Sequence, residues 1–284
     1  MKGKVCIITG ATAGIGLETA ARLGALGARL ILVGRNRDKG AAALNALRGR
    51  APNLVAEFYY ADLSRRDEII RLASELLRAL PRIDVLLNNA GALFTRRETT
   101  ADGLERTFAL NHMGYFLLTH LLRERLVASA PARIVNVASN AHLKSPPLDF
   151  ADLQYTKAYN GLKAYQRSKL CNVLFTRELA RRLAGTGVTA NSLHPGFVAS
   201  SFGDNNGFMF RIGIGLAKRF SAISLEEGAE TPVYLASAPE VATVSGRYFV
   251  HAREALPSPA AQDDDAAARL WRETATLAGL AQVP

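Results

Sequence analysis

The chain has 284 residues, 49% of them hydrophobic, and this length and composition suit a single α/β domain with one large core. Its formal charge of +10 would suit an anionic partner, but the basic residues are dispersed and only 7% of residues are aromatic, so we expect no nucleic acid binding. The two cysteines are far apart in sequence, which argues against a disulfide framework or a zinc site, and no apolar stretch is long enough to span a membrane.

Short runs rich in Val, Ile and Leu alternate with longer segments of helical composition. The expected strands are Val5–Thr9, Arg29–Val33, Ala56–Tyr60, Val85–Asn88, Arg133–Ala138, Thr189–Leu193 and Tyr248–Val250, and the expected helices include Leu17–Leu26, Arg66–Leu80, Leu104–Val127 and Ala164–Leu183. This alternation predicts one doubly wound, Rossmann-type domain over residues 1–284, with a mainly parallel seven-stranded sheet and helices on both faces. Ligands of such sheets gather beyond the carboxyl ends of the strands.

A glycine-rich turn follows the first expected strand. Between Thr9 and Gly16 the glycines have the spacing Gly-x-x-x-Gly-x-Gly, and a helix follows at once. Glycines allow a tight turn and a close approach of the backbone to a diphosphate, which the N-terminus of the helix then faces. The candidate cofactor-binding residues of this turn are Gly10, Thr12, Gly14, Ile15 and Gly16.

The residues after the second and third strands bear on the choice of dinucleotide. Arg35 stands where a carboxylate would commonly bind the ribose hydroxyls of NAD, and its guanidinium suits the 2′-phosphate of NADP(H). Arg37 and Lys39 either add to this field or are ordinary exposed helix residues. Asp62, with its neighbour Leu63, is a candidate for the adenine side of the site, and a helix N-cap is the alternative for Asp62.

Two Tyr-x-x-x-Lys pairs, Tyr159 with Lys163 and Tyr165 with Lys169, could place a phenol and an ammonium on one helix face. We choose Tyr165 because a sustained helical segment follows it, whereas Asn160 and Gly161 follow Tyr159. A nearby ammonium should lower the phenol pKa from its usual value of about 10 and so favour proton transfer. Ser139, directly after the fifth strand, could polarise a substrate carbonyl.

Two segments stand apart from the alternation. Residues 197–222 form a long loop whose apolar residues are candidates for a substrate lid, with core packing or a partner surface as alternatives: Phe202, Phe208, Met209, Phe210 and Ile212. Arg211, Lys218 and Arg219 leave open a peripheral membrane contact. The tail, residues 253–284, looks less ordered, except for a short docking helix around Leu270 and Trp271. The five histidines show no metal-ligand spacing, so we expect no metal site and expect surface or turn positions for them.

Taken together, these motifs resemble the short-chain dehydrogenase/reductase superfamily over roughly Lys4 to Val250. The residues that carry the resemblance are Thr9–Gly16, Asn88-Asn89-Ala90-Gly91, Asn111, Ser139, Tyr165 with Lys169, and Pro195-Gly196. The sequence is further similar to the retinol dehydrogenase-like branch through Ala141-His142, Asp149–Leu153, Ser168–Leu179, Leu193–Gly196 and Ser245–Phe249. The 26 positions from Ser139 to Tyr165 match an insertion of this branch.

The resemblance implies a role for each matching residue. It implies Ser139, Tyr165 and Lys169 as the catalytic set, with Asn111 anchoring a water that relays protons to Lys169. It also implies further cofactor contacts: Asn89, Ala90 and Gly91 beside the dinucleotide, and Pro195, Gly196, Val198 and Ser200 along the nicotinamide. Tyr165 and Lys169 belong to both sets.

We therefore expect an NADP(H)-dependent oxidoreductase that interconverts a small apolar alcohol with its aldehyde or ketone. The alternatives are a carbon–carbon double-bond reductase of the protochlorophyllide reductase type and a catalytically idle NADP(H)-binding sensor or scaffold. The apolar run at the start of the chain is too short for a signal peptide, so we expect a cytoplasmic protein with at most peripheral membrane contact. Dimers and tetramers are common in the superfamily, so a homodimer or homotetramer is possible.

Overall fold

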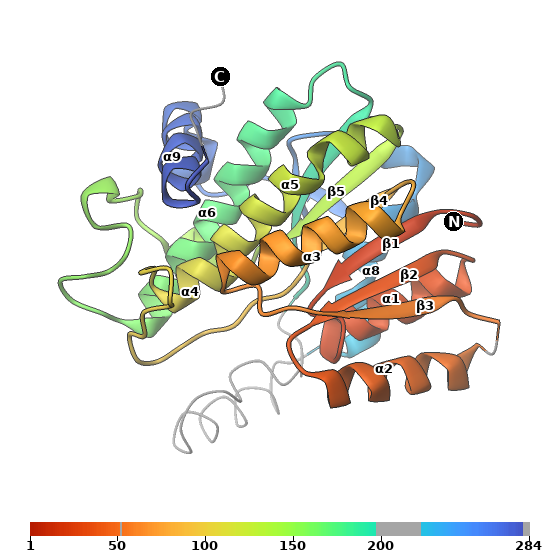
Figure 1. The fold of residues 1–284 in the computed structure, drawn as a ribbon. Helices are drawn as coiled ribbons and strands as arrows, with labels where there is room; N and C mark the ends of the chain where they lie inside the picture. Colours follow the sequence, from red (N-terminus) through yellow and green to blue (C-terminus); the bar gives the residue numbers. More distant parts are fainter. Residues whose placement is uncertain (52, 197–222, 281–284) are drawn as a thin grey trace.

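A computed structural model describes residues 1–51, 53–196 and 223–280 (Figure 1). Within these residues, eight strands form one sheet in the order β3-β2-β1-β4-β5-β6-β7-β8. They are β1 (Val5–Thr9), β2 (Arg29–Gly34), β3 (Ala56–Tyr60), β4 (Val85–Asn88), β5 (Ala132–Val137), β6 (Val188–His194), β7 (Tyr248–Val250) and β8 (Arg253–Ala255). All neighbouring strands are parallel except β7 and β8, which are antiparallel. The order reverses between β1 and β4, and this is the place where a doubly wound sheet opens to ligands.

Helices cover both faces of the sheet. The long ones are α1 (Gly14–Ala25), α2 (Arg37–Arg50), α3 (Arg66–Ala79), α5 (Gly114–Ala128), α6 (Gly161–Arg182), α8 (Leu225–Ser237) and α9 (Asp264–Leu277), and α4 (Arg106–Phe108) is a single short turn. A π-helix, η1 (Ala109–Met113), joins α4 to α5, and short 3-10 helices are η2 (Asn140–Lys144), η3 (Phe150–Asp152), η4 (Pro239–Val241) and η5 (Pro259–Gln262).

Each face of the sheet has its own apolar core. In Figure 1, α3, α5 and α6 lie on one face, and their buried Leu, Ile and Phe residues pack against Ile7, Ile31 and Leu86 of the central strands. On the other face, α1, α2 and α8 pack against the alternate residues of the same strands, including Ile8 and Leu32. Because both faces are buried, the strands are almost continuously apolar, as expected for a parallel sheet.

The fold class predicted from the sequence is confirmed, but the expected number of strands, seven, is wrong. The additional strand, β8, is a three-residue edge strand of the sequence Arg-Glu-Ala, which carries no alternation of apolar and polar residues. The tail is also more ordered than expected, because η5 and α9 follow β8 and α9 packs beside α6 (Figure 1). The docking helix expected around Leu270 and Trp271 is α9, in which both residues are buried.

Two further sequence expectations can be compared with the described residues. None of the helices in the described part of the chain combines the length and apolar character needed to cross a bilayer. Within the same residues, no group of three or more His, Cys, Asp or Glu side chains is placed to hold a metal ion. The proposed substrate lid, 197–222, lies outside the described residues.

Candidate active site

The ends of β1 and β4 are joined through the side chain of Thr9. Its Oγ1 accepts hydrogen bonds from the backbone N–H groups of Asn89 at 2.8 Å and Ala90 at 3.1 Å, and it donates to the carbonyl oxygen of Leu87 at 3.3 Å. The side-chain amide of Asn89 reaches back to the carbonyl oxygens of Thr9, at 2.9 Å, and Gly10, at 3.2 Å. These contacts hold the turn after β1 beside the turn after β4, so the two predicted cofactor-binding segments meet.

The glycine-rich turn is packed too closely against its own backbone and Asn89 to admit a side chain at Gly16. A Cβ atom at Gly16 would lie 2.5 Å from both the carbonyl oxygen of Gly10 and Nδ2 of Asn89. Gly10 and Gly14 both have positive φ angles, 65° and 57°. Helix α1 begins here with no side-chain cap and no acidic residue in its first turn, so its first N–H groups face outward without a competing side chain. The turn therefore fits the diphosphate of a dinucleotide.

Arg35 directly follows β2, at the carboxyl edge of the sheet, and is exposed. Its neighbour Asn36 caps α2 by accepting a hydrogen bond from the N–H of Lys39 at 2.8 Å. Arg37 lies over the ring of Tyr60, with its guanidinium carbon 5.0 Å from the ring centroid. Arg37 and Lys39 are exposed as well, and the contact with Tyr60 favours the structural interpretation of Arg37.

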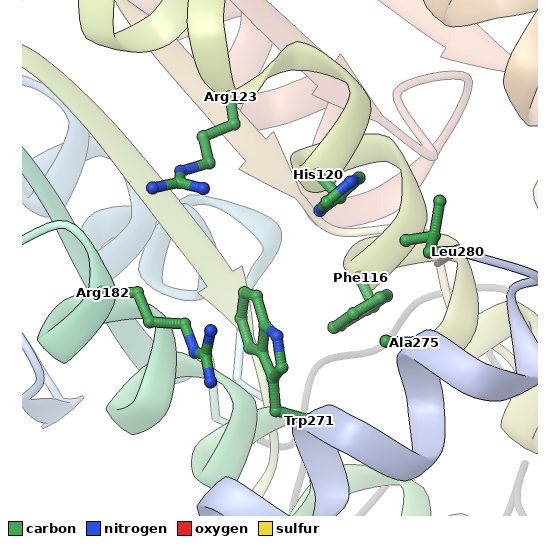
Figure 2. Close-up of a pocket in the computed structure, with 7 residues that line it drawn as sticks. All are labelled: Phe116, His120, Arg123, Arg182, Trp271, Ala275 and Leu280. Atoms are coloured by element: carbon green, nitrogen blue, oxygen red, sulfur yellow. The ribbon is translucent and has the colours of Figure 1, made fainter. Parts of the chain in front are cut away.

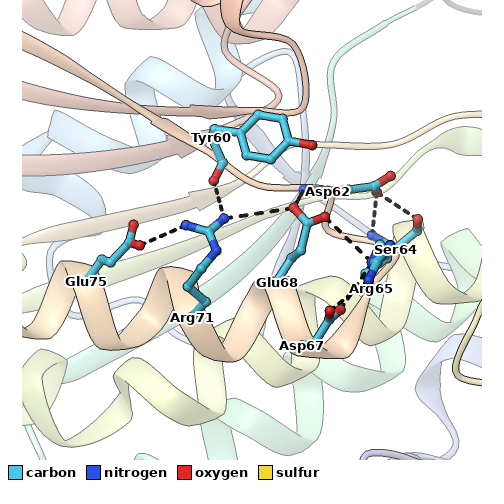
Figure 3. A network of polar contacts seen from close by, with 8 residues as sticks. All are labelled: Tyr60, Asp62, Ser64, Arg65, Asp67, Glu68, Arg71 and Glu75. Atoms are coloured by element: carbon cyan, nitrogen blue, oxygen red, sulfur yellow. Dashed lines mark hydrogen bonds and ion pairs between the residues drawn. The ribbon is translucent and has the colours of Figure 1, made fainter.

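Asp62 lies at the centre of a polar network after β3 (Figure 3). Its Oδ1 accepts hydrogen bonds from the N–H of Ser64 at 2.9 Å and from the Ser64 hydroxyl at 2.7 Å, while its own N–H donates to Glu68 at 2.8 Å. The helix-cap alternative for Asp62 is wrong, because the N-cap residue of α3 is Arg65. Oδ1 of Asp62 accepts both of these hydrogen bonds. The next residue, Leu63, is buried.

Ser139 and Tyr165 lie in contact at the carboxyl end of β5. Ser139 follows that strand and caps η2, and its side chain forms a hydrogen bond with the phenol of Tyr165, which lies in the second turn of α6. Burial raises the pKa of Tyr165 to about 12, and the bond from Ser139 acts in the opposite direction. The expected lowering of this pKa is therefore wrong in this structure: desolvation of the phenolate dominates.

Lys169 lies one helical turn after Tyr165 and is buried. Its Nζ is 5.7 Å from the centroid of the Tyr165 ring and donates a hydrogen bond to the carbonyl oxygen of Val137 at 3.0 Å. A Cβ at Gly91 would lie 3.4 Å from the same Nζ, so the segment after β4 also reaches the amine. Burial lowers the pKa of Lys169 to about 7.

Asn111 belongs to the π-helix η1, a type of helical irregularity that is frequent at functional sites. It is fully buried, and its Nδ2 donates to the carbonyl oxygen of Ala92 and to Oγ of Ser168, both at 2.9 Å. Its Oδ1 accepts from the N–H of Ala92 at 2.9 Å and lies 3.3 Å from a Cβ built at Gly91. Asn111 thus joins the turn after β4 to α6, one residue before Lys169.

The rejected pair, Tyr159 and Lys163, does not share a helix face. Helix α6 begins at Gly161, and the Tyr159 hydroxyl donates to the carbonyl oxygen of Phe94 at 2.9 Å and lies 3.1 Å from Glu105. Tyr159 therefore holds the insertion before α6 against the loop after β4. This geometry favours Tyr165 as the reactive phenol.

The predicted nicotinamide side of the site is described only in part. Gly196 has a φ of 91°, and a Cβ there would lie 2.2 Å from Cδ1 of Ile223, so the turn after β6 requires glycine. Pro195 precedes it at the end of β6. Val198 and Ser200 lie outside the described residues.

The sequence analysis missed two buried histidines beside the site. His112, in η1, and His142, in the short helix η2, are both fully buried. The expectation that the histidines lie at the surface or in turns is therefore wrong for these two. A lone histidine in a sequence carries no spacing signal. His112 was marked only by its position directly after Asn111, whereas His142 belongs to the Ala141-His142 pair that carries the branch resemblance and follows Ser139 by three residues.

A small pocket lies away from these residues, between α5, α6 and α9 (Figure 2). Its lining residues are Phe116, His120, Arg123, Arg182, Trp271, Ala275 and Leu280. None of the predicted catalytic or cofactor-binding residues is among them, so this pocket is not the candidate active site.

Comparisons with known proteins confirm the resemblance drawn from the motifs. The family described as short chain dehydrogenase matches residues 4–207. Retinol dehydrogenase 13 of Homo sapiens is 42% identical over 98% of this chain and 85% of its own length, and retinol dehydrogenase 14 of Homo sapiens is 42% identical over 99% and 87%. A solved structure of an uncharacterized protein from Mycobacterium Paratuberculosis is 29% identical, with a TM-score of 0.80 over 100% of this chain and 96% of that one. A protein described as an NAD(P)-dependent gluconate 5-dehydrogenase from Beutenbergia cavernae, with bound NADP, is 25% identical, with a TM-score of 0.72 over 88% and 96%.

Proposed function

Because this chain belongs to the short-chain dehydrogenase family and is an oxidoreductase, we propose that it interconverts an apolar alcohol and its carbonyl with NADP(H). The observation that carries the proposal is the contact of Ser139 with Tyr165, one helical turn from the buried Lys169, whose Nζ lies 3.4 Å from a Cβ built at Gly91 in the turn after β4. These are an acid, a hydrogen-bond donor and a cation in the place where a doubly wound sheet binds its ligand.

In this proposal, Tyr165 is the general acid and base. The dinucleotide supplies the hydride for carbonyl reduction and accepts it in the reverse reaction. Tyr165 donates its phenol proton to the substrate oxygen during reduction and takes it back during oxidation, while Ser139 donates a hydrogen bond to the same oxygen. A phenol with a pKa of about 12 is protonated at neutral pH, which suits the reductive direction. Lys169 and Asn111, which both lie next to Gly91, are the residues through which the proton of Tyr165 would be exchanged with solvent.

The preference for NADP(H) rests on Arg35. Arg35 is an exposed residue directly after β2, and a planar guanidinium can form a bidentate, charge-assisted contact with a 2′-phosphate. The acidic residue that would bind the ribose hydroxyls of NAD is missing at this position. The glycine-rich turn from Gly10 to Gly16 would hold the diphosphate.

An apolar substrate is supported by two exposed leucines beside the catalytic segments. Leu143, in the same short helix that Ser139 caps, is 51% exposed, and Leu162, three residues before Tyr165 on α6, is 56% exposed. Residues three apart on a helix lie on one face, so Leu162 lies on the face of the reactive phenol. The relatives named retinol dehydrogenases also point to apolar alcohols.

The proposal is tested by following NADPH absorbance with a panel of carbonyl compounds: retinal, straight-chain aldehydes of increasing length, aromatic ketones and an enone. We expect turnover that increases with apolar surface, and an allylic alcohol as the product from the enone. A saturated ketone as the product would instead support the double-bond reductase alternative. Tight NADPH binding with no oxidation by any member of the panel would support the sensor alternative and contradict the proposal.

A further inference from the structure

His142 lies between the catalytic loop and the end of the chain. Its Nδ1 is 2.7 Å from the carbonyl oxygen of Ser139, and its Nε2 accepts a hydrogen bond from the backbone N–H of Ser258 at 3.2 Å. The ring is fully buried and lies edge-on to the ring of Tyr248, at a centroid distance of 4.9 Å. Thus the residue touches neither of the proposed proton-transfer groups directly, but it binds the backbone of one of them.

The two partners of His142 fix its tautomer. The N–H of Ser258 can only donate, so Nε2 carries no proton; the carbonyl of Ser139 can only accept, so Nδ1 carries the proton. A charged ring would lose the bond from Ser258, and burial, which lowers the pKa of His142, also disfavours that form. The backbone N–H of His142 donates to the same Ser139 carbonyl at 3.1 Å. His142 therefore donates to Ser139 twice.

The segment that provides Ser258 is itself held firmly. We define the C-terminal segment as residues 253–280. Its helix α9 places Trp271 edge-on to Phe116, at 4.9 Å between ring centroids, and stacks it on Phe175 at 5.9 Å. Thr274 of α9 lies 3.0 Å from Nε2 of the buried His112, the residue that follows Asn111. The segment thus contacts the helices on either side of the site and presents a fixed donor to His142.

We propose that His142 is a positioning residue through which the C-terminal segment orients the hydroxyl of Ser139. The inference rests on the proposed function, because it gives Ser139 a role in catalysis. Ser139 is extended at the start of η2, and its Oγ meets Tyr165 on one side while its carbonyl meets His142 on the other. Rotation of this residue would move Oγ relative to the phenol, and displacements of about 1 Å in an active site can cost about 100-fold in rate.

The test removes a single backbone donor. Ser258 has a φ of −59°, which suits proline, so Ser258→Pro needs no new backbone angle at this residue. The variant replaces the N–H by the ring Cδ, which faces Nε2, so the His142 ring both loses its bond and is displaced. The matched control is Ser258→Ala, which keeps the N–H, and its hydroxyl has no hydrogen-bond partner among the described residues. We expect Ser258→Pro to lower kcat by roughly tenfold, with an unchanged KM for NADPH, and Ser258→Ala to match the wild type. Equal kcat values for the two variants would overturn the proposal.

A second pair of variants keeps the proposal testable if Ser258→Pro does not fold. His142→Asn places an amide N–H near the position of Nδ1, whereas His142→Gln places its amide near Nε2 and loses the donor to Ser139. We expect His142→Asn to retain more of the wild-type kcat than His142→Gln, with equal thermal stability of the two variants. The reverse order would contradict positioning through the Ser139 carbonyl, and so would kcat values that fall only as far as the thermal stability of each variant falls.

A spectroscopic measurement separates this inference from the proposed function. In protein labelled with ¹⁵N-histidine, we expect the His142 ring to show a protonated Nδ1 and an unprotonated Nε2 at neutral pH in the wild type and in Ser258→Ala. The opposite tautomer, or a charged ring, would overturn the inference whether or not the protein reduces carbonyls. If the wild type reduces no carbonyl while this tautomer is seen, the proposed function fails and the structural link stands.

Discussion

Lys169 donates a hydrogen bond from Nζ to the carbonyl oxygen of Val137 at 3.0 Å, and the amine is buried with no carboxylate among the described residues acting on its pKa. The same carbonyl lies 3.5 Å from both the hydroxyl of Tyr115 and Nδ2 of Asn172. Val137 ends β5, two residues before Ser139. The proposed cation and the proposed hydroxyl are therefore placed by the same strand end.

The first prediction concerns the stability cost of this buried amine. A buried charge carries a desolvation penalty of roughly several kcal/mol, and an apolar side chain of similar length avoids it. We expect Lys169→Met to raise the free energy of unfolding at pH 6 by about 1–3 kcal/mol while abolishing carbonyl reduction. The Val137 carbonyl keeps Tyr115 and Asn172 as donors, so it is not left without a partner.

The pH dependence of this difference follows from the lowered pKa of Lys169, about 7 in the folded protein. Below pH 7 the amine is charged in both states and the burial cost is complete. As the pH rises from 7 toward the unfolded value of about 10.4, the folded state loses its proton first, so the wild type gains stability. Urea denaturation at pH 6 and pH 9 should show a smaller gap between wild type and Lys169→Met at pH 9. A constant or widening gap would contradict this account.

The second prediction separates the two tyrosines of the paired motifs. We expect Tyr165→Phe to lower turnover by roughly 10²–10⁴-fold, the usual contribution of a positioned general acid, and to weaken NADPH binding far less than it lowers turnover. Tyr159→Phe is the control, because it deletes a hydroxyl that binds Phe94 and Glu105 and should lower the melting temperature without a comparable loss of turnover. The measurements are steady-state kinetics, NADPH fluorescence titration and thermal denaturation. Undiminished turnover by Tyr165→Phe would exclude its proposed role.

The sequence predicted most of the fold because each buried strand left a local signal. The apolar runs at Ala56–Tyr60, Val85–Asn88 and Tyr248–Val250 coincide with strands of the structure. Strand β8 left no such signal, because it is three residues long, is polar and exists through its pairing with β7. The ordered position of the tail likewise depends on contacts of α9 with distant helices.

The candidate site was predictable where a residue type and its spacing carried the chemistry. The spacing of Tyr165 and Lys169 placed both on one helix, and the position of Ser139 after a strand placed it at the ligand edge. The direction of the Tyr165 pKa shift was not predictable, since burial of the phenol is a tertiary property. The contact between His142 and Ser258 joins residues 116 positions apart, which no local pattern reveals.

The third prediction concerns the dinucleotide. We expect Arg35→Asp to weaken NADP binding by roughly tenfold or more, since a bidentate, charge-assisted contact is lost and a repulsive carboxylate is added, and to improve NAD binding. Arg48→Asp is the matched control: it makes the same change of charge on an exposed residue in the last turn of α2. Kd values for both dinucleotides, measured at two salt concentrations, separate the local contact from the net charge. An unchanged preference in Arg35→Asp would refute the role given to Arg35.

The fourth prediction compares two glycines that differ in the space around them. A Cβ at Gly16 would meet the carbonyl oxygen of Gly10 and Nδ2 of Asn89, both at 2.5 Å, whereas a Cβ at Gly49, in α2, would meet nothing within 4 Å. We expect Gly49→Ala to stabilise the protein by about 0.5–1 kcal/mol, because alanine is the better helix former. Gly16→Ala should destabilise the protein by about 1–3 kcal/mol through overpacking. It should also weaken dinucleotide binding at temperatures where the variant is still folded. Thermal denaturation with and without NADPH measures both effects. Because the clash would displace Gly10 or Asn89 and so deform the turn, a Gly16→Ala variant that gains as much stability from NADPH as the wild type would show that the diphosphate does not bind at this turn.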